Sequence, residues 1–285
     1  MKQSLILIGL FLLLYTSLSS TNAGEPESYE MPRTQVIPIQ DSKSKGQYEL
    51  YIKLPEDYSK DSDKVYPVLY STDAVWHIEI LSASTEFIIE DVILVGISWR
   101  KDTADDLKEQ YGEHVSRFTD YSFWKKTNPK HPKLVFGQAN NHLAFIRNDV
   151  ISYVEKNYRT DPSNRAYFGY SLSGLFGAYI LVTQPDTFKH YILGSPSVDL
   201  LARYKVETTN KNFNANVFIS RGTLEEEKLQ EPISEFVNSL NARNDKSLSI
   251  ESAVIEGNHQ TAFPMTGVRA VTWLASLINL ASEEE

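Results

Sequence analysis

The chain has 285 residues, of which 41% are hydrophobic and 23% charged, and it contains no cysteine. This composition is typical of a globular protein with a large core. The absence of cysteine excludes both a disulfide framework and a lipid-modified N-terminal cysteine. The formal net charge of −9 argues against a nucleic-acid-binding surface, and no Lys/Arg-rich run offsets it.

The N-terminus has the pattern of an export signal. Lys2 provides a basic start, an apolar run covers 5–15, and small residues offer a cleavage point after Ala23. A membrane anchor is the alternative, but an anchor needs about 20 apolar residues. We therefore predict a signal peptide at 1–23 and an exported chain, secreted or periplasmic, that forms one domain at 24–285 without a stable membrane anchor.

Strand and helix patterns alternate in the first half of the exported chain. Alternating apolar residues predict a half-buried strand at 47–54. Continuous apolar runs predict strands buried on both faces at 65–71 and 91–98, with a helix at 78–89 between them. The segment 99–140 is polar and aromatic without a clear period, which is typical of a functional or mobile loop.

The alternation continues in the second half. An apolar stripe predicts a helix over 141–158, and it consists of Leu143, Ile146, Val150, Ile151, Val154 and Tyr158. Strands are predicted at 165–169, 191–195, 216–220 and 247–255, and helices at 172–182, about 231–243 and 264–280. This order predicts an α/β fold with a mostly parallel central sheet and helices on both faces. Such sheets bind ligands at the carboxyl ends of their strands.

The stretch from Gly169 to Ser173 almost matches G-x-S-x-G, the turn that presents a nucleophilic serine between a strand and a helix. The turn needs small residues two positions before and after the nucleophile. With Ser171 as nucleophile these are Gly169 and Ser173, whereas Ser173 as nucleophile would place the bulky Leu175 there. We predict Ser171 as the nucleophile, with the Ser173 hydroxyl bonded to local backbone.

A hydrolase of this kind has its residues in the order serine, acid, histidine. Only His190 and His259 follow Ser171. His190 precedes its predicted strand and so lies at the amino edge of the sheet. His259 follows the strand at 247–255, at the carboxyl edge, and is therefore the predicted base.

The acid is expected after the strand at 216–220, where Glu225, Glu226 and Glu227 follow one another. One of them can accept the ring N–H of His259 and stabilise the imidazolium. Asp199, one strand earlier, is the competitor. Spacing alone does not separate the three glutamates.

The oxyanion hole requires two backbone N–H groups. One is predicted at Leu172, directly after the nucleophile, and the other in the loop around Asp73 and Ala74. No metal site is expected because the histidines lack ligand spacing. No glycine-rich loop fits a phosphate or dinucleotide, so we expect no cofactor.

These motifs resemble the putative-esterase group of α/β-hydrolases, which includes esterase D-like enzymes and siderophore esterases. The resemblance covers roughly 34–280, and its pieces occur in order as "LPEDY", "YPVLYSTD", "VGISWR", "RFTDYS", "FGYSLSGLFGAY", "ISRGTLEEE" and "EGNH". The family's usual elbow is G-x-S-x-G-G, and here Ser173 replaces the first glycine of that pair. The resemblance implies an α/β-hydrolase fold.

The resemblance also implies roles for single residues. The family's G-x-x-E segment, which carries the acid, fits Gly222 to Glu225 and favours Glu225. "RFTDYS" is similar to the family's R-x-x-D-Y motif, which implies that Arg117 reaches the substrate while Asp120 and Tyr121 shape the cleft.

We therefore predict an exported serine esterase that cleaves small-molecule carboxylic esters, of siderophore, aryl or acyl type, through Ser171, His259 and Glu225. An acyl-enzyme would form and water would release it. One alternative is an acyltransferase on the same fold, in which an alcohol replaces water. The other is a non-catalytic binding protein, in which Ser173 marks a decayed elbow.

Overall fold

A computed structural model describes residues 28–58, 62–126, 129 and 131–283, except for the side chains of 279–283. The chain divides into two units, Met1–Met31 and Pro32–Glu285, and the fold described below is that of the second. The predicted signal peptide lies outside the described residues. Among the described residues, no helix is long and apolar enough to span a bilayer.

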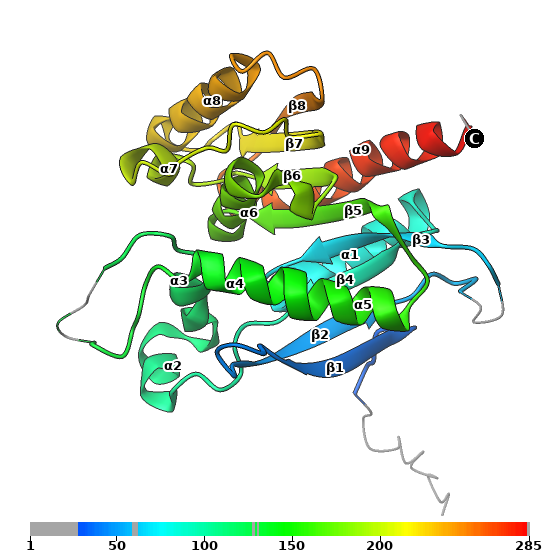
Figure 1. Cartoon of the computed structure of the whole chain (residues 1–285), viewed down its shortest axis with the longest axis horizontal. Coiled ribbons are helices and arrows are strands. Elements are labelled where there is room, and N and C mark those ends of the chain that lie inside the picture. Colours follow the sequence, from blue (N-terminus) through cyan, green and yellow to red (C-terminus); the bar gives the residue numbers. More distant parts are fainter. Residues whose placement is uncertain (1–27, 59–61, 127–128, 130, 284–285) are drawn as a thin grey trace, which may run out of the picture. The chain divides into compact units, whose positions relative to one another are not determined.

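An eight-stranded sheet with the order β1-β2-β4-β3-β5-β6-β7-β8 forms the centre of this unit (Figure 1). Its strands are β1 (Thr34–Gln40), β2 (Gln47–Lys53), β3 (Tyr66–Ser71), β4 (Ile93–Ile97), β5 (Thr160–Tyr170), β6 (His190–Gly194), β7 (Ala215–Gly222) and β8 (Leu248–Ile255). β2 pairs antiparallel with β1 and β4, and the other pairs are parallel. The predicted mostly parallel sheet is confirmed. The edge strand β1 was not predicted, since it has no fully buried side chain and contains Pro38.

Helices cover both faces of the sheet, as predicted (Figure 1). They are α1 (Ala74–Ile88), α2 (Asp105–Tyr111), η1 (Glu113–Ser116), α3 (Arg117–Asp120), α4 (Ala139–Phe145), the π-helical η2 (Ile146–Ile151), α5 (Ser152–Asn157), α6 (Leu172–Thr183), η3 (Pro185–Thr187), α7 (Asp199–Arg203), α8 (Glu227–Asn241) and α9 (Phe263–Glu283). α1 and α9 pack together on one face. α1 joins β3 to β4 in the direction opposite to the later crossovers, so right-handed connections place α4, α6 and α8 on the other face.

The segment 99–140 differs from the expected loop because it contains α2, η1 and α3. Each of these helices is at most seven residues long, too short for an apolar stripe to repeat. The predicted helix over 141–158 is present, but it changes to a π-helical turn at Ile146–Ile151.

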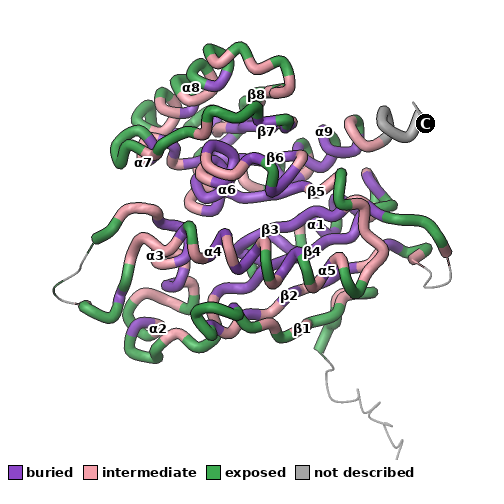
Figure 2. Tube along the Cα trace, in the orientation of Figure 1, coloured by how far each residue is buried: buried purple, intermediate pink, exposed green. Residues whose placement is uncertain are grey.

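The core lies along the central strands. Every residue of β4 and of β6 is buried, whereas β1 at one edge and β8 at the other are largely exposed (Figure 2). The carboxyl ends of the inner strands lie level with one another, as shown by the pairs Ser71–Phe168, Tyr170–Gly194, Gly194–Ser220 and Gly222–Ile255. The loops that follow β3, β5, β7 and β8 therefore emerge side by side.

Candidate active site

Ser171 occupies a strained turn between β5 and α6. Its φ of 58° and ψ of −115° lie outside the regions that L-residues favour, and strain of this kind clusters at functional sites. The turn is held by its own backbone, because the Ser171 N–H donates to the Gly194 carbonyl at 2.8 Å. The Ser171 carbonyl accepts from the Leu175 N–H at 2.9 Å.

The residues on either side of Ser171 explain why the turn tolerates its unusual sequence. A Cβ atom on Gly169 would lie 2.3 Å from the Ser173 carbonyl oxygen, so this glycine is required. Ser173 is fully buried. Its Oγ accepts from the Tyr170 N–H and donates to the Tyr170 carbonyl, each at 2.9 Å. The hydroxyl that departs from the family pattern is thus satisfied within the turn.

His259 lies in the loop after β8 and bridges Ser171 and Glu225. Its Nε2 is 2.8 Å from the Ser171 Oγ, and its Nδ1 is 2.7 Å from the Glu225 Oε1. An ionised carboxylate can only accept, so Nδ1 carries the proton and Nε2 is free to accept from Ser171. These three side chains, which lie far apart in the sequence, form a hydrogen-bonded chain at the carboxyl edge of the sheet.

The Glu225 carboxylate is held ionised in a buried position. Its side chain is fully buried, whereas the His259 side chain is 27% exposed. Burial alone would raise the pKa of Glu225, but the hydrogen bonds from His259 and the Gly222 backbone outweigh it and lower the pKa. A negative charge therefore persists beside the imidazole, where it can stabilise an imidazolium.

Several residues around the hydrogen-bonded chain of Ser171, His259 and Glu225 were not predicted. The Tyr170 hydroxyl donates to the His259 carbonyl at 2.8 Å, and the Gln230 side chain donates to the Glu225 carbonyl at 2.5 Å. The Glu225 Oε2 and the Ser195 Oγ are both buried, and Ser195 helps His259 and the Gly222 backbone to lower the pKa of Glu225. These residues carry no motif of their own, so only the strand register could have indicated them.

The competing acids and base lie elsewhere. His190 is buried at the start of β6 between Asn164 and Asn216. Asp199 pairs with Arg203 on α7, and Glu226 with Lys228 at the start of α8. Glu227 is exposed. Of the acids weighed from the sequence, only Glu225 meets His259.

Asp73 follows β3 and begins α1 in the left-handed conformation, with a φ of 56°. One residue separates it from Ser71, which pairs with Phe168 of β5, so this loop leaves the sheet beside the Ser171 turn. The first N–H groups of a helix have no intrahelical acceptor. Those of Leu172 on α6 and Ala74 on α1 are therefore available for an oxyanion.

The Asp73 side chain is a buried anchor, a role that the sequence did not predict. Arg117 donates to its two oxygens at 2.7 and 2.8 Å, the Trp99 Nε1 donates at 2.7 Å, and the Tyr121 hydroxyl donates at 3.1 Å. Burial would raise the pKa of Asp73, but the Arg117 charge and these donors lower it. The network fixes α3 to the loop that precedes α1.

The residues of the R-x-x-D-Y motif thus have identifiable positions. The Arg117 side chain is 11% exposed and lies 4.7 Å from the ring centre of Trp76, itself 45% exposed. Tyr121 is buried against Phe176, and Asp120 is buried on the other side of α3, where it accepts from Tyr48. Trp76 was one of many aromatic residues in the sequence, and nothing in its context marked it.

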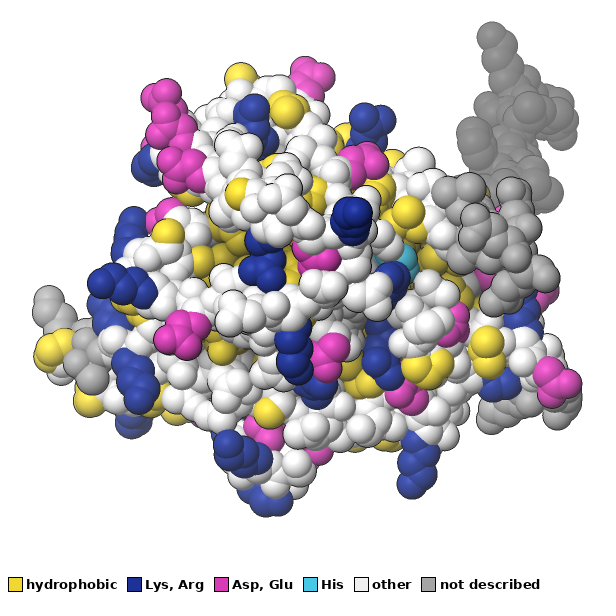
Figure 3. All heavy atoms as spheres, turned by 45° about the horizontal axis from the view of Figure 1, so that its top comes forward, with side chains coloured by type: hydrophobic (Ala, Val, Ile, Leu, Met, Phe, Trp, Pro, Cys, Tyr) yellow, Lys and Arg dark blue, Asp and Glu magenta, His cyan; other side chains and the backbone are white. Residues whose placement is uncertain are grey.

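Figure 3 shows Lys, Arg, Asp and Glu side chains interspersed over one face of the molecule, with hydrophobic side chains in the hollow between them. Mixed charge gives this face no electrostatic preference for a polyanion. Within the described residues, no cluster of three or more His, Cys, Asp or Glu side chains could hold a metal ion.

Comparisons with known proteins identify the family and the fold of this chain. A family model described as "Putative esterase" matches residues 42–261. The ferri-bacillibactin esterase BesA of Bacillus subtilis (strain 168) is 24% identical over 274 residues, which cover 88% of this chain and 92% of that protein.

Two solved structures share the fold. The BES protein from Bacillus cereus has a TM-score of 0.72 at 23% identity, with 88% of this chain and 99% of that chain covered. The siderophore hydrolase EstB from Aspergillus nidulans has a TM-score of 0.65 at 20% identity, with 87% and 96% covered. The α/β-hydrolase fold and the resemblance inferred from the motifs are confirmed, and this chain belongs to the Putative esterase family.

Proposed function

We propose that this protein is a serine esterase in which Ser171, His259 and Glu225 act as a catalytic triad. The observation that carries the proposal is the continuous hydrogen-bonded chain from the Ser171 Oγ through His259 to the buried Glu225. A strained serine at the end of a central strand adds to it. In a turn that no longer served catalysis, nothing would select for this alignment of Ser171, His259 and Glu225.

The reaction follows from these positions. Ser171 attacks the ester carbonyl while the His259 Nε2 takes its proton, and Glu225 stabilises the resulting imidazolium. The N–H of Leu172, with one from Asp73 or Ala74, holds the oxyanion. His259 then protonates the leaving alcohol, and an acyl-Ser171 ester remains. Water then loses a proton to the His259 Nε2 and attacks the acyl carbonyl, the carboxylic acid is released, and His259 returns the proton to the Ser171 Oγ.

We further propose siderophore-type esters as the substrate class, with aryl and acyl esters as simpler substrates. The support comes from two similar proteins, because one relative is named a ferri-bacillibactin esterase and one similar structure is called a siderophore hydrolase. We expect such a ligand to reach Trp76 and Arg117, because Trp76 follows the loop after β3 and Arg117 binds Asp73 in that loop, which leaves the sheet next to β5. The export signal at 1–23 and a mature chain from Gly24 belong to the same proposal. N-terminal sequencing of protein recovered outside the cytoplasm tests them, and an intact Met1 there would contradict cleavage after Ala23.

Hydrolysis of an ester panel by the purified protein tests the proposed activity. The panel contains a siderophore trilactone, a feruloyl ester and an aryl acetate. We expect turnover of the trilactone to exceed that of the others, and Ser171→Ala to lower turnover by about 10⁶. Failure to hydrolyse any ester would contradict the esterase. Release of acyl groups only to an added alcohol would instead indicate a transferase.

A further inference from the structure

A cavity separate from the proposed triad lies on the side of α3 that faces away from Asp73. It has a volume of about 380 Å³, and its lining comes from α2, α3, α4, the β1–β2 turn and the loop after β4. A volume of this size suits a small organic ligand. No member of the proposed triad lines it. We call it the α3 cavity.

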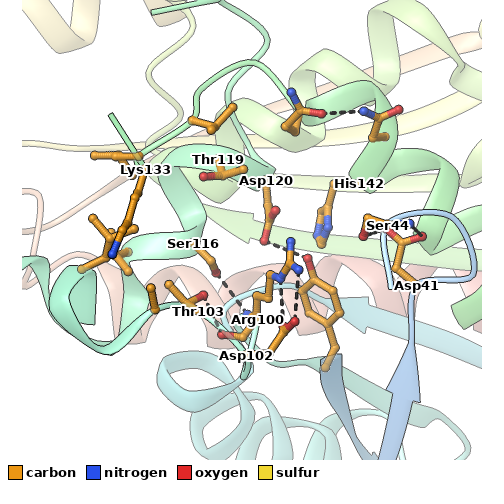
Figure 4. A pocket seen from close by; sticks show the side chains of 18 residues that line it. Asp41, Ser44, Arg100, Asp102, Thr103, Ser116, Thr119, Asp120, Lys133 and His142 are labelled. Carbon is orange, nitrogen blue, oxygen red and sulfur yellow. Dashed lines mark hydrogen bonds and ion pairs between the residues drawn. The ribbon is translucent and has the colours of Figure 1, made fainter. Parts of the chain in front are cut away.

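Three buried polar side chains converge on the α3 cavity. Figure 4 shows the side chains of Asp120 and His142 extending side by side in the same direction from α3 and α4, with the Arg100 side chain reaching toward them from below. Asp120, His142 and Tyr48 are 6%, 4% and 3% exposed. Tyr48 donates its hydroxyl hydrogen to Asp120 at 3.1 Å, so its own lone pairs are left to accept.

His142 is the least satisfied of these groups. Its Nε2 is buried without a hydrogen-bond partner among the described residues. Burial lowers the pKa of His142 to about 4, so the ring is neutral near pH 7 and carries one bare nitrogen lone pair. A buried polar atom without a partner is costly, which makes it a strong sign of a missing ligand or water.

The charges around the α3 cavity favour a positive ligand. Arg100 is neutralised, since Asp102 accepts from it at 2.8 and 3.1 Å. Asp41 is buried nearby and adds a negative charge. Burial raises the pKa of Asp120 to about 7, although the hydrogen bond from Tyr48 and the charge of Arg100 act to lower it. Lys133 also lines the cavity and pairs with Asp106, so Asp41 and Asp120 are the lining carboxyl groups to which the described residues provide no ion pair.

The opposite wall of the α3 cavity is apolar. Leu107, Val115 and Leu134 form a small hydrophobic cluster there, and all three line the cavity. If the cavity held only water, these apolar side chains would stay exposed to solvent, whereas a hydrocarbon group would remove them from water, which is favourable. The ligand thus needs a donor-rich cationic end and an apolar body.

We propose that the α3 cavity binds a small organic amine, whose ammonium group donates to Asp120, His142 and Tyr48 and whose hydrocarbon part lies against Leu134. The ammonium offers three donors and no acceptor, which matches the groups left free. The inference does not depend on the activity of Ser171, because the cavity lies on the far side of α3.

Isothermal titration calorimetry with benzylamine tests the proposal, and benzyl alcohol is the probe of matched size without charge. We expect benzylamine to bind with a Kd below about 1 mM. We expect benzyl alcohol to bind at least about tenfold more weakly, because charge-assisted hydrogen bonds are the stronger ones. This comparison uses only the unmodified protein, so it holds even if a variant fails to fold.

Variants then locate the site. Asp120→Asn and His142→Phe should each weaken benzylamine binding at least about tenfold. Asp105→Asn is the matched control, because Asp105 is exposed on α2, and it should bind as the unmodified protein does. Ser171→Ala should also bind benzylamine unchanged. The proposal is overturned by no binding, by equal affinity for benzyl alcohol, by full binding in Asp120→Asn, or by loss of binding in Ser171→Ala.

Discussion

Two buried carboxylates flank the proposed site, and they differ in their partners. Glu225 meets His259, whose ring is partly exposed and can gain or lose a proton. Asp73 meets Arg117, whose guanidinium keeps its charge at every accessible pH. Both carboxyl groups have side chains that are fully buried, and the pKa of each is lowered.

The partner of a buried carboxylate therefore decides whether the carboxylate serves catalysis or structure. A charge beside a titratable ring is useful in the transition state, because the imidazolium forms only there. A charge beside a permanent cation is satisfied in the resting protein and mainly holds structure. We therefore expect changes at Glu225 to affect rate more than stability, and changes at Asp73 to do the reverse.

Of the two buried carboxylates, Glu225 should have the larger effect on rate when it is replaced. Glu225→Gln keeps the size but removes the charge that stabilises the imidazolium and fixes the ring tautomer. We expect kcat to fall by up to about 10⁴. Steady-state kinetics on an aryl acetate, with folding checked by circular dichroism, measures this.

Glu226→Gln and Asp199→Asn are the matched controls for that experiment. The Glu226 side chain is 70% exposed, and Asp199 is bonded to Arg203, so neither should alter kcat strongly. A severe loss in Asp199→Asn together with a near-normal Glu225→Gln would place the acid one strand earlier.

Replacement of Asp73 should have the largest effect on stability. Asp73→Asn leaves the buried Arg117 charge uncompensated, and we expect the free energy of unfolding to fall by about 3–5 kcal/mol. Denaturant unfolding measures it. The double variant Asp73→Asn/Arg117→Met removes both charges and should recover much of the loss. If the single and double variants lose equally, the ion pair is not the anchor.

Lowering the pH should decrease the contribution that both carboxylates make to the free energy of unfolding. Each has its folded pKa below the ordinary value of about 4, so the stability it provides is present above that value and lost as pH falls through the folded pKa. The unfolding free energy of Glu225→Gln should therefore decrease less steeply than that of the unmodified protein below about pH 4. Parallel curves would show that folding does not lower the pKa of Glu225.

Ser173→Ala should have the smallest effect. It removes the two hydrogen bonds to the Tyr170 backbone while keeping a small side chain, so we expect a loss of about 1 kcal/mol in stability and most activity retained. Thermal unfolding and ester kinetics check both. An inactive Ser173→Ala with an active Ser171→Ala would reverse the assignment of the nucleophile.

The sequence predicted the central strands well because their apolar runs are continuous and bounded by turns. It also predicted the positions of Ser171 and His259 relative to the sheet, because carboxyl ends of parallel strands share an edge. It did not predict α3, which has four residues, or the Asp73 anchor. That anchor joins residues from three separate segments, and no local pattern encodes such a contact.

The choice among Glu225, Glu226 and Glu227 shows the same limit. Spacing alone leaves them equivalent, and Glu225 is favoured by the family motif and by the expectation that the first residues after a strand lie nearest the site. In the structure, Glu225 turns inward before α8 begins, whereas Glu226 and Glu227 face solvent at its start. Direction after a strand end depends on backbone geometry, which composition does not record.

The most direct test of the account is the site of labelling by a fluorophosphonate, which reacts with an activated serine. Intact-mass and peptide mass spectrometry of the purified protein should show one label, on Ser171. Ser171→Ala should take up none, and Ser173→Ala should label as the unmodified protein does. A label on Ser173, or no label on a folded protein that still binds ester substrates, would contradict the proposal that Ser171 is an activated nucleophile.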